Sequence, residues 1–543
     1  MQEFGLLNVA IVAAYLIGNL YLGFAMSRRI HTANEYYIGD KSAPWWAIGI
    51  SVMATYVSAL SFLGGPAWAY TDGMAALAIH VNYTLVIFIC VSIFVPFFYN
   101  SGVVSIYDYL NKRFGIISQT IMSGLFIITI TISAASILTA TGIVVTFATG
   151  LESQYAIILM TVIVLVYTLM GGMNAVIWTD VLQGIILIIG AMIIFGFLLV
   201  KVGALPDAFA FLEANDKLNP INTDFDLSIA PTIWAGVVAM TVYHITVYGA
   251  NQMMVQRVLA AKTIGDAKKS YLFMGYVAFI LYFIFIFIGA LLYVFYEAKP
   301  FDQTNAIILN FAESLAIPGL LGIIGAAILS ASMSSTSSAF NSLATVTISD
   351  FYKLFYKSEA SDEHYLKASR IVTVMWAVVI VPIALAFVES TGSILETMAS
   401  VLSYLVGAKF AMFGMGFFSK HVSERGLIIG VIAGFVAVYI SARGVPVLGI
   451  EDPNIAWPWY AVIGSVVNIA AAWIASITLD GSKTEWHRYS VPGQQMMFAE
   501  EKKPITEDGW YLVPGRIEKP VWGLLGMFAL IIIFMMWFGT LAP

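Results

Sequence analysis

The fold is indicated most directly by residues 51–66, which read SVMATYVSALSFLGGP. The stretch is apolar enough to lie in a lipid bilayer, yet the run from Gly64 to Pro66 is expected to interrupt its helix. In lipid every backbone N–H and C=O group needs a hydrogen-bond partner. A broken helix is therefore expected only where other protein segments or a water-filled cavity surround it.

A second interruption is expected in the span 231–258, where Gly236 and Gly249 flank His244. Two interrupted helices separated by four spans are typical of an inverted-repeat transporter whose binding site lies near the bilayer midplane. Glycines also allow helices to pack closely, and this simpler interpretation stays open at both places.

The composition places the rest of the chain in a membrane as well. Of 543 residues, 60% are hydrophobic and only 11% are charged, whereas soluble proteins have about 25% charged residues. Such a chain cannot supply the surface of a soluble enzyme or of a nucleic-acid-binding protein, so no nucleic-acid partner is expected. The single cysteine, Cys90, excludes an internal disulfide framework and a cysteine-rich metal site.

Span length gives the expected architecture. A membrane helix needs about 20 mostly apolar residues, and this criterion predicts an all-α polytopic membrane protein with about 14 transmembrane helices. The spans are expected at 4–26, 45–72, 74–100, 116–148, 155–171, 174–200, 231–258, 268–297, 318–350, 366–388, 393–419, 423–443, 456–478 and 518–541.

The lysine and arginine residues orient these spans by the positive-inside rule. With the N-terminus outside, most of the 26 such residues fall in inner loops, among them Arg257 and Lys268. We therefore expect a multi-pass protein of the plasma (inner) membrane with both termini outside. The outer loops then hold only Lys201, Lys217, Lys299 and Arg443.

The densest polar signal within a span is residues 331–342, which read ASMSSTSSAFNS. On a helix Ala331, Ser334, Ser335 and Ser338 share one face. That face offers hydroxyl oxygens without formal charge, and hard cations prefer oxygen ligands. The pattern favours a sodium site, although hydroxyls also bond to their own helix or to a neighbouring one.

Four ionisable residues lie inside spans, where such residues are costly and usually functional. They are Asp180, His80, His244 and Lys409. For the histidines the alternative is a neutral ring satisfied by its neighbours, and for Lys409 a snorkelling or paired ammonium. Asp180 could instead cap a helix. No catalytic motif lies in a usable context, so the protein is not expected to be an enzyme.

Four ordered motifs carry a family resemblance. The chain resembles the sodium:solute symporter family, which includes sodium/glucose, proline, sialic-acid and monocarboxylate transporters. The motifs are EYY and PWWAIGIS (35–37 and 44–51), GGMNAVIWTDVLQ (171–183), QRVLAAK (256–262) and NSLATVTISDFY (341–352).

The resemblance implies the leucine-transporter fold: ten core helices in two inverted five-helix repeats, with one helix before the core and three after it. The implied segments are an N-terminal helix with its inner loop (1–44), the first repeat (45–200), an outer loop (201–230), the second repeat (231–420), two extra helices (421–478), a cytoplasmic loop (479–517) and a final helix (518–543).

The resemblance also implies the coupling ion, Na+, and its ligands. The general sodium site maps to the carbonyls of Ala54, Val57 and Ala331 and to the hydroxyls of Ser334 and Ser335. Some members bind a second sodium ion. That site maps to Asp180, Ser334, Ser337 and Ser338, so two sodium ions per cycle are expected.

The substrate is less well determined by the same comparison. The positions of the sugar-binding lysine and of a polar group in the tenth core helix are Ala278 and Ala399. We expect import of a small polar organic solute, sugar-like or carboxylate, by alternating access. Proton coupling in the same fold and a non-transporting membrane sensor remain alternatives. The candidate substrate-binding residues are Thr55, Tyr56, Ser58, Ser61, His80, Ser133, His244 and Lys409.

Overall fold

The computed structural model describes residues 5–27, 33–388, 393–444, 451–481 and 485–542. The first part of the chain forms α1 (Leu6–Ser27), α2 (Ala33–Ile38), α3 (Trp45–Tyr56), η1 (Leu60–Gly64), α4 (Gly65–Asp72), η2 (Gly73–His80), α5 (Tyr83–Ile89), η3 (Cys90–Phe94), α6 (Val95–Ser101), α7 (Asp108–Arg113), α8 (Ile116–Thr149), α9 (Ser153–Lys201) and α10 (Leu205–Ala214).

The second part is also helical apart from one short hairpin. It forms η4 (Ala235–Ala239), α11 (Met240–Tyr248), α12 (Gln252–Leu259), α13 (Ile264–Phe295), η5 (Thr304–Ala306), α14 (Ile307–Ser314), α15 (Leu320–Val346), η6 (Thr347–Tyr356), α16 (Asp362–Ala386), α17 (Ile394–Phe418), α18 (Glu424–Arg443), α19 (Pro458–Asp480), α20 (Val491–Glu500), the antiparallel strands β1 (Thr506–Glu507) and β2 (Trp510–Tyr511), and α21 (Lys519–Phe538).

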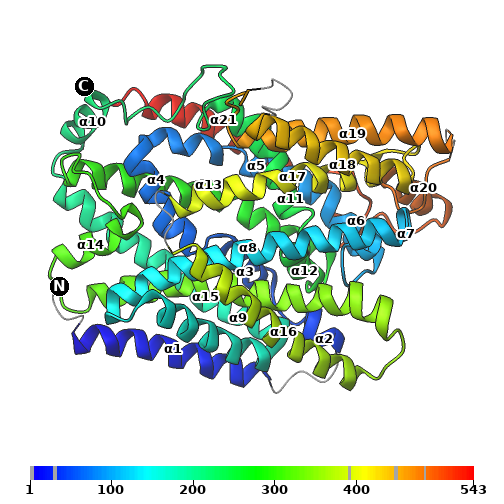
Figure 1. The fold of residues 1–543 in the computed structure, drawn as a ribbon, viewed down its shortest axis with the longest axis horizontal. Helices are drawn as coiled ribbons and strands as arrows, with labels where there is room; N and C mark the ends of the chain where they lie inside the picture. Colours follow the sequence, from blue (N-terminus) through cyan, green and yellow to red (C-terminus); the bar gives the residue numbers. More distant parts are fainter. Residues whose placement is uncertain (1–4, 28–32, 389–392, 445–450, 482–484, 543) are drawn as a thin grey trace.

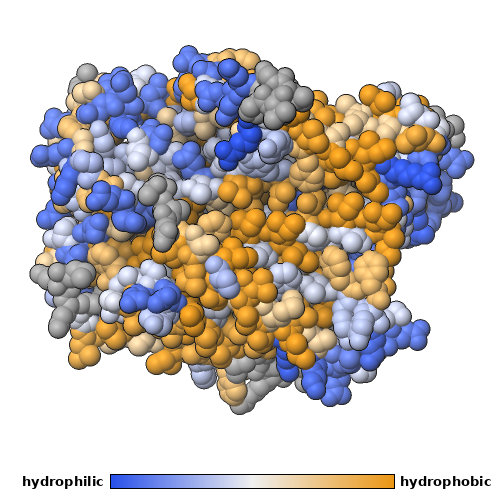
Figure 2. All heavy atoms as spheres, in the orientation of Figure 1, coloured by the Kyte–Doolittle hydropathy of each residue, from blue (hydrophilic) through white to orange (hydrophobic). Residues whose placement is uncertain are grey.

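Eleven helical segments among the described residues are long and apolar enough to cross a membrane. In Figure 2 hydrophobic residues form a broad band across the middle of the visible face, and hydrophilic residues gather at both ends of that band. The helices run from one polar end to the other (Figure 1). The beginning of α1 and the end of α21 lie at the same end, together with α10 and α14, whereas α2, α7 and α20 lie at the opposite end.

The serine-rich helix α15 forms the centre of the bundle. It packs against α9, α8, α1 and α16, and nearly all of its side chains are buried. Small residues make this close packing possible: a Cβ atom added at Gly190 of α9 would lie 2.3 Å from the Ala327 Cβ of α15. Hydroxyl groups on α15 are therefore shielded from lipid on every side.

The first helix break lies earlier than expected. α3 ends at Tyr56, and Val57 has the non-helical dihedral angles φ −77° and ψ 89°. The Ser58 hydroxyl accepts the Leu60 N–H at 3.2 Å as the chain enters η1. The expectation that the run Gly64 to Pro66 interrupts the span was wrong, because Pro66 occupies the first turn of α4, where a missing N–H loses no helical hydrogen bond.

The second break lies between α11 and α12. The helix stops after Tyr248, and Asn251 caps α12 by accepting the Met253 N–H at 2.9 Å. Gly249 belongs to this break, but Gly236 lies within η4. A Cβ atom at Gly236 would lie 2.0 Å from the Ala78 carbonyl oxygen, so close packing explains this glycine.

Two cations assigned to inner loops are buried in helices instead. Lys268 of α13 forms an ion pair with Glu518 at 2.6 Å, with side-chain exposures of 0% and 6%. Glu518 also accepts the Tyr511 N–H at 2.7 Å, which joins the hairpin to the base of α13. The second cation, Arg257, is completely buried in α12.

Candidate functional site

The expected residues of the general sodium site lie on two helices that pack together, at the end of α3 and on α15. The last carbonyl groups of a helix have no partner within that helix, and here the Thr55 carbonyl accepts a hydroxyl of α15. The Ser335 hydroxyl lies 2.8 Å from the Thr55 carbonyl oxygen and 3.2 Å from the Ala331 carbonyl oxygen. Ala54 and Val57 flank Thr55 on the same helix end and are also buried.

This donor set fits a sodium ion. It combines backbone carbonyl and serine hydroxyl oxygens, all of them hard ligands. The residues that would hold the ion are Ala54, Val57, Ala331, Ser334 and Ser335, all with exposures of 1% or less.

The Asp180 carboxylate lies beside this set, on α9. Ser334 donates to its Oδ1 at 2.6 Å, and Ser51 donates to its Oδ2 at 2.5 Å. The guanidinium of Arg257 forms an ion pair with Oδ2 at 3.0 Å, and both side chains are fully buried. Arg257 also donates to Ser51 at 2.8 Å and to Ser338. One carboxylate therefore binds both the hydroxyl face of α15 and a fixed cation.

Two further serines expected in the second sodium site join this network through the backbone. Ser337 and Ser338 donate to the Ser334 carbonyl at 3.0 and 2.6 Å. Asp180 and Ser334 are thus in direct contact, Ser338 is linked to Asp180 through Arg257, and Ser337 is connected only through the Ser334 carbonyl.

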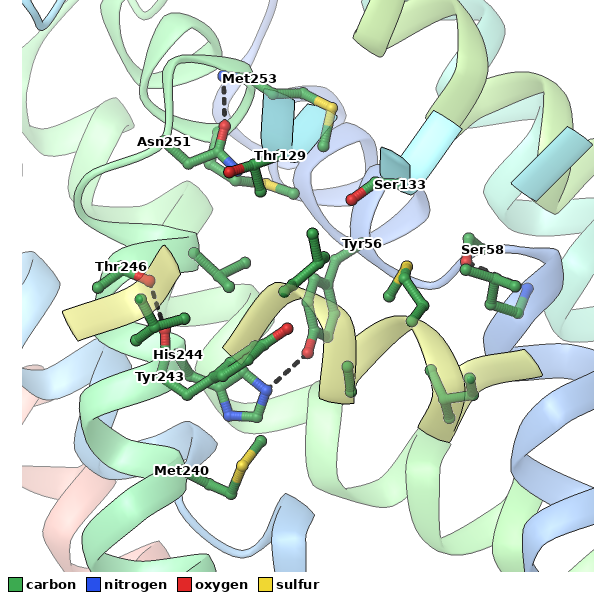
Figure 3. A pocket seen from close by; sticks show the side chains of 18 of the residues that line it. Tyr56, Ser58, Thr129, Ser133, Met240, Tyr243, His244, Thr246, Asn251 and Met253 are labelled. Carbon is green, nitrogen blue, oxygen red and sulfur yellow. Dashed lines mark hydrogen bonds between the residues drawn. The ribbon is translucent and has the colours of Figure 1, made fainter. Parts of the chain in front are cut away.

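A cavity of about 120 Å³ adjoins the end of α3. Thr55 belongs both to this wall and to the contact with Ser335. Figure 3 shows side chains from several separate elements converging on the space. The expected residues in its wall are Thr55, Tyr56, Ser58, His80, Ser133, His244 and Lys409.

Ser61 is the expected residue that the cavity wall does not include. Its hydroxyl lies 2.8 Å from the hydroxyl of Tyr282, and Tyr282 does line the cavity. Ser61 therefore contacts the wall from behind.

The two histidines belong to one hydrogen-bonded chain. His244 Nδ1 lies 2.6 Å from Asn82 Oδ1, and its Nε2 lies 2.8 Å from the Tyr56 hydroxyl (Figure 3). The Tyr56 and Tyr83 hydroxyls are 3.1 Å apart, and Tyr83 lies 2.8 Å from His80 Nδ1. Sequence reasoning missed Asn82 and Tyr83. The three-residue spacing of His80 and Tyr83 was the available signal, because such residues are neighbours on one helical turn.

Lys409 projects from α17 into the same cavity and is only 5% exposed. No hydrogen bond or ion pair joins its ammonium group to any residue in the described part of the chain. The cavity therefore contains one lysine side chain without a protein partner in the described part of the chain.

Comparison with known proteins establishes the family. The family model described as "Sodium:solute symporter family" matches residues 36–434. This chain belongs to the sodium:solute symporter family. A sodium/sialic acid symporter of Proteus mirabilis is 29% identical over 503 residues, which cover 89% of this chain and 99% of the relative. A sodium-dependent multivitamin transporter of Oryctolagus cuniculus is 27% identical, with coverage of 81% and 70%.

A solved structure supports the same assignment. A Na+-coupled sialic acid symporter, in a substrate-bound outward-open state, superimposes with a TM-score of 0.80 at 28% identity. The match covers 89% of this chain and 100% of that structure. The protein is accordingly a mostly helical, multi-pass membrane symporter with Na+ as its coupling ion.

Proposed function

We propose that this symporter imports a small polar organic solute by alternating access, with the solute bound in the cavity beside the end of α3. One observation carries the proposal: Thr55 both lines the cavity and accepts the hydroxyl of Ser335 at 2.8 Å. Solute and ion would therefore share the end of one broken helix, so occupancy of one site orders a wall of the other.

The proposed ion sites are those described above. The general site uses Ala54, Val57, Ala331, Ser334 and Ser335, and the second uses Asp180 with Ser334, Ser337 and Ser338. Bound Na+ supplies positive charge that the membrane potential favours moving inward, at about 2.3 kcal/mol for each charge crossing 100 mV. The protein's residues would hold that charge by hydroxyl and carbonyl oxygens at the general site and by the Asp180 carboxylate with serine oxygens at the second.

We further propose the finer architecture. Fourteen crossings follow if the segments Leu60–Ser101 and Ser153–Lys201 each form two consecutive spans and the shorter apolar helix Ala235–Tyr248 belongs to one more. The shared location of the α1 start and the α21 end supports an even number of crossings (Figure 1). The proposed orientation places both termini outside in the plasma membrane. The proposed repeats are 45–200 and 231–420, with the remaining segments bounded as stated from the sequence.

A measurement on purified protein tests sodium binding and the solute class together. Thermal unfolding is followed in sodium and in potassium, alone and with a panel of sugars, amino acids and carboxylates, because a ligand that binds the native state raises its stability. We expect stabilisation by a solute that is larger in sodium than in potassium. Equal stabilisation in both salts would contradict a shared solute and ion site.

The stoichiometry needs a separate experiment. In proteoliposomes held at a fixed membrane potential, two sodium ions per cycle predict two charges moved per neutral solute, or one charge per monocarboxylate. A ratio of one sodium ion to one solute would remove the second site from the proposal.

Proton coupling is the second candidate, because the chain from Asn82 to His80 contains two imidazole rings and two hydroxyl groups. Such a chain can carry a proton between its ends. Uptake driven by a pH gradient in sodium-free buffer would favour this mechanism, and its absence would exclude it.

A further inference from the structure

His80 Nε2 is a buried nitrogen without a partner among the described residues. The side chain is 3% exposed, lines the cavity beside the end of α3, and stacks on Tyr282 with ring centroids 4.0 Å apart. A buried polar atom that lacks a hydrogen bond is costly. In a cavity wall it marks the place where a ligand group completes the bond.

Whether this nitrogen donates or accepts is determined at the far end of the chain, by Asn82. The amide nitrogen of Asn82 lies 2.9 Å from the carbonyl oxygens of both Ile79 and Gly236. Both of its N–H groups are thereby used as donors, so its Oδ1 atom is the acceptor. His244 Nδ1, which is 2.6 Å away, must carry a proton.

The donor and acceptor of each following hydrogen bond can then be assigned in turn, from His244 to His80. In a neutral His244 ring, Nε2 accepts, so the Tyr56 hydroxyl donates to it. Tyr56 has one proton, so the Tyr83 hydroxyl donates to the Tyr56 oxygen. Tyr83 in turn has no proton left, and His80 Nδ1 must donate to it. A neutral His80 ring therefore has a lone pair on Nε2, and the His80 side chain belongs to the cavity wall.

A protonated chain would reverse this result, because Nε2 would then carry a proton. The Lys409 side chain also lines the cavity, and no carboxylate lines it among the residues that the structure describes. A buried imidazolium without an anionic partner is strongly disfavoured. The neutral chain is therefore the arrangement that the surroundings support.

Lys409, which lines the same cavity, requires a hydrogen-bond acceptor on the solute. Its ammonium group has three N–H donors and no acceptor, and it is 5% exposed. An anionic oxygen of the solute would neutralise it through a charge-assisted hydrogen bond. An ammonium-bearing solute would instead add positive charge beside Lys409 and His80.

We propose that the cavity binds a hydroxycarboxylate, whose hydroxyl donates to His80 Nε2 and whose carboxylate is held by Lys409. This inference rests on the proposed solute site, and it adds the chemical class of the solute. Tyr83 and Asn82 act as positioning residues, because they fix the tautomer of His80 without lining the cavity.

Two matched sets of solutes test the class by binding to the purified full chain in sodium. The six-carbon set is gluconate, glucitol and hexanoate. The three-carbon set is lactate, 2-methoxypropionate, propionate, propane-1,2-diol and alanine. We expect gluconate or lactate to bind at least tenfold more tightly than every other member of its set. The methoxy compound is the sharpest comparison, since it keeps the oxygen and the carboxylate but cannot donate.

Single-residue variants show which side chains produce the expected differences in solute affinity. His80→Phe keeps a ring over Tyr282 and should reduce the hydroxy-to-methoxy affinity ratio to about one. Lys409→Met should reduce the ratio of the hydroxycarboxylate affinity to the matched polyol affinity to about one. Tyr83→Phe frees the tautomer of His80 and should narrow the hydroxy-to-methoxy ratio, an effect that a purely structural role would not produce. Tyr271→Phe, which removes a buried hydroxyl bonded to the Tyr248 carbonyl at 2.7 Å, should leave the ratio unchanged.

The outcomes separate this inference from the proposed function. Equal binding of the methoxy compound, the polyol or alanine would overturn the inference, as would binding of no hydroxycarboxylate in either set. Sodium-driven uptake of a different solute class would overturn it and leave the proposed symport intact. The expected binding pattern without sodium-driven uptake would support the inference and contradict the proposed function.

Discussion

The Ser335 hydroxyl lies between two carbonyl groups that belong to different helices, 2.8 Å from Thr55 and 3.2 Å from Ala331. The hydroxyl and both carbonyl groups are uncharged, so burying them inside a membrane protein costs less desolvation free energy than burying a charged side chain. At this proposed site the only formal charge would be that of the bound ion.

Removing that hydroxyl should weaken sodium binding. Hydrogen bonds or ligand contacts to charged groups contribute about 1.5–3 kcal/mol, so Ser335→Ala should raise the sodium concentration for half-maximal thermal stabilisation about tenfold or more. Ser342→Ala is the matched control, because this hydroxyl bonds to the Ser338 carbonyl of its own helix. An unchanged sodium dependence in Ser335→Ala would remove Ser335 from the site.

The buried ion pair between Arg257 and Asp180 gives a second prediction at this scale. Arg257→Gln leaves a buried carboxylate without its cation and should cost about 3–5 kcal/mol of stability. The double variant with Asp180→Asn removes both charges and should recover most of that loss. Retention of folded protein after heating, measured by size-exclusion chromatography, compares the three proteins. A double variant as unstable as Arg257→Gln would show that the charge imbalance is not the cause.

Individual residues were predictable where one helix carried the pattern. The serine face of α15 followed from spacing alone, because residues three and four apart lie on one side of a helix. The role of Arg257 did not follow, since the positive-inside rule assigns a cation near a span end to a loop. Only the packing of α12 against α3 and α15 buries it beside Asp180.

Helix breaks determine which backbone carbonyl groups lack a hydrogen-bond partner within a helix. The breaks at Gly172 and Val57 differ in backbone conformation. At Gly172, within α9, φ is 49° and ψ is −156°, a conformation that is essentially restricted to glycine. At Val57 the break uses ordinary dihedral angles and a serine hydroxyl. The expected limits of the spans 155–171 and 174–200 bracket the break at Gly172, whereas the break at Val57 was misplaced.

The Gly172 break predicts a position-specific cost. Gly172→Ala should destabilise the fold by about 1–3 kcal/mol, because alanine is strained at that backbone conformation. Gly196→Ala on the same helix is the control, since a Cβ atom there meets nothing within 4 Å and its backbone is helical. Equal apparent melting temperatures for the two variants would show that the break at Gly172 is not a fixed feature of the fold.

Across the whole molecule, polar residues separate into two ends and apolar residues form the band between them (Figure 2). Composition and span length predicted this arrangement, because both depend on local sequence. The hydrogen-bonded chain of His80 and His244 could not be predicted, since it joins η2, α3, α5 and α11 through tertiary packing.

The proposed orientation can be tested with single cysteines, since the native Cys90 is buried. Ser228→Cys lies in the proposed outer loop and Lys502→Cys in the proposed cytoplasmic loop. A membrane-impermeant maleimide should label the first in intact cells and the second only after permeabilisation. The reverse pattern would invert the topology.

The central claim is that an inward sodium gradient drives accumulation of the solute, and uptake into proteoliposomes tests it most directly. The solute is the one that gives the largest sodium-dependent stabilisation, and the gradient is imposed with sodium outside and potassium inside. We predict accumulation above equilibrium, increased by an inside-negative potential and abolished when choline replaces sodium. The same accumulation in choline, or in a pH gradient without sodium, would contradict the account.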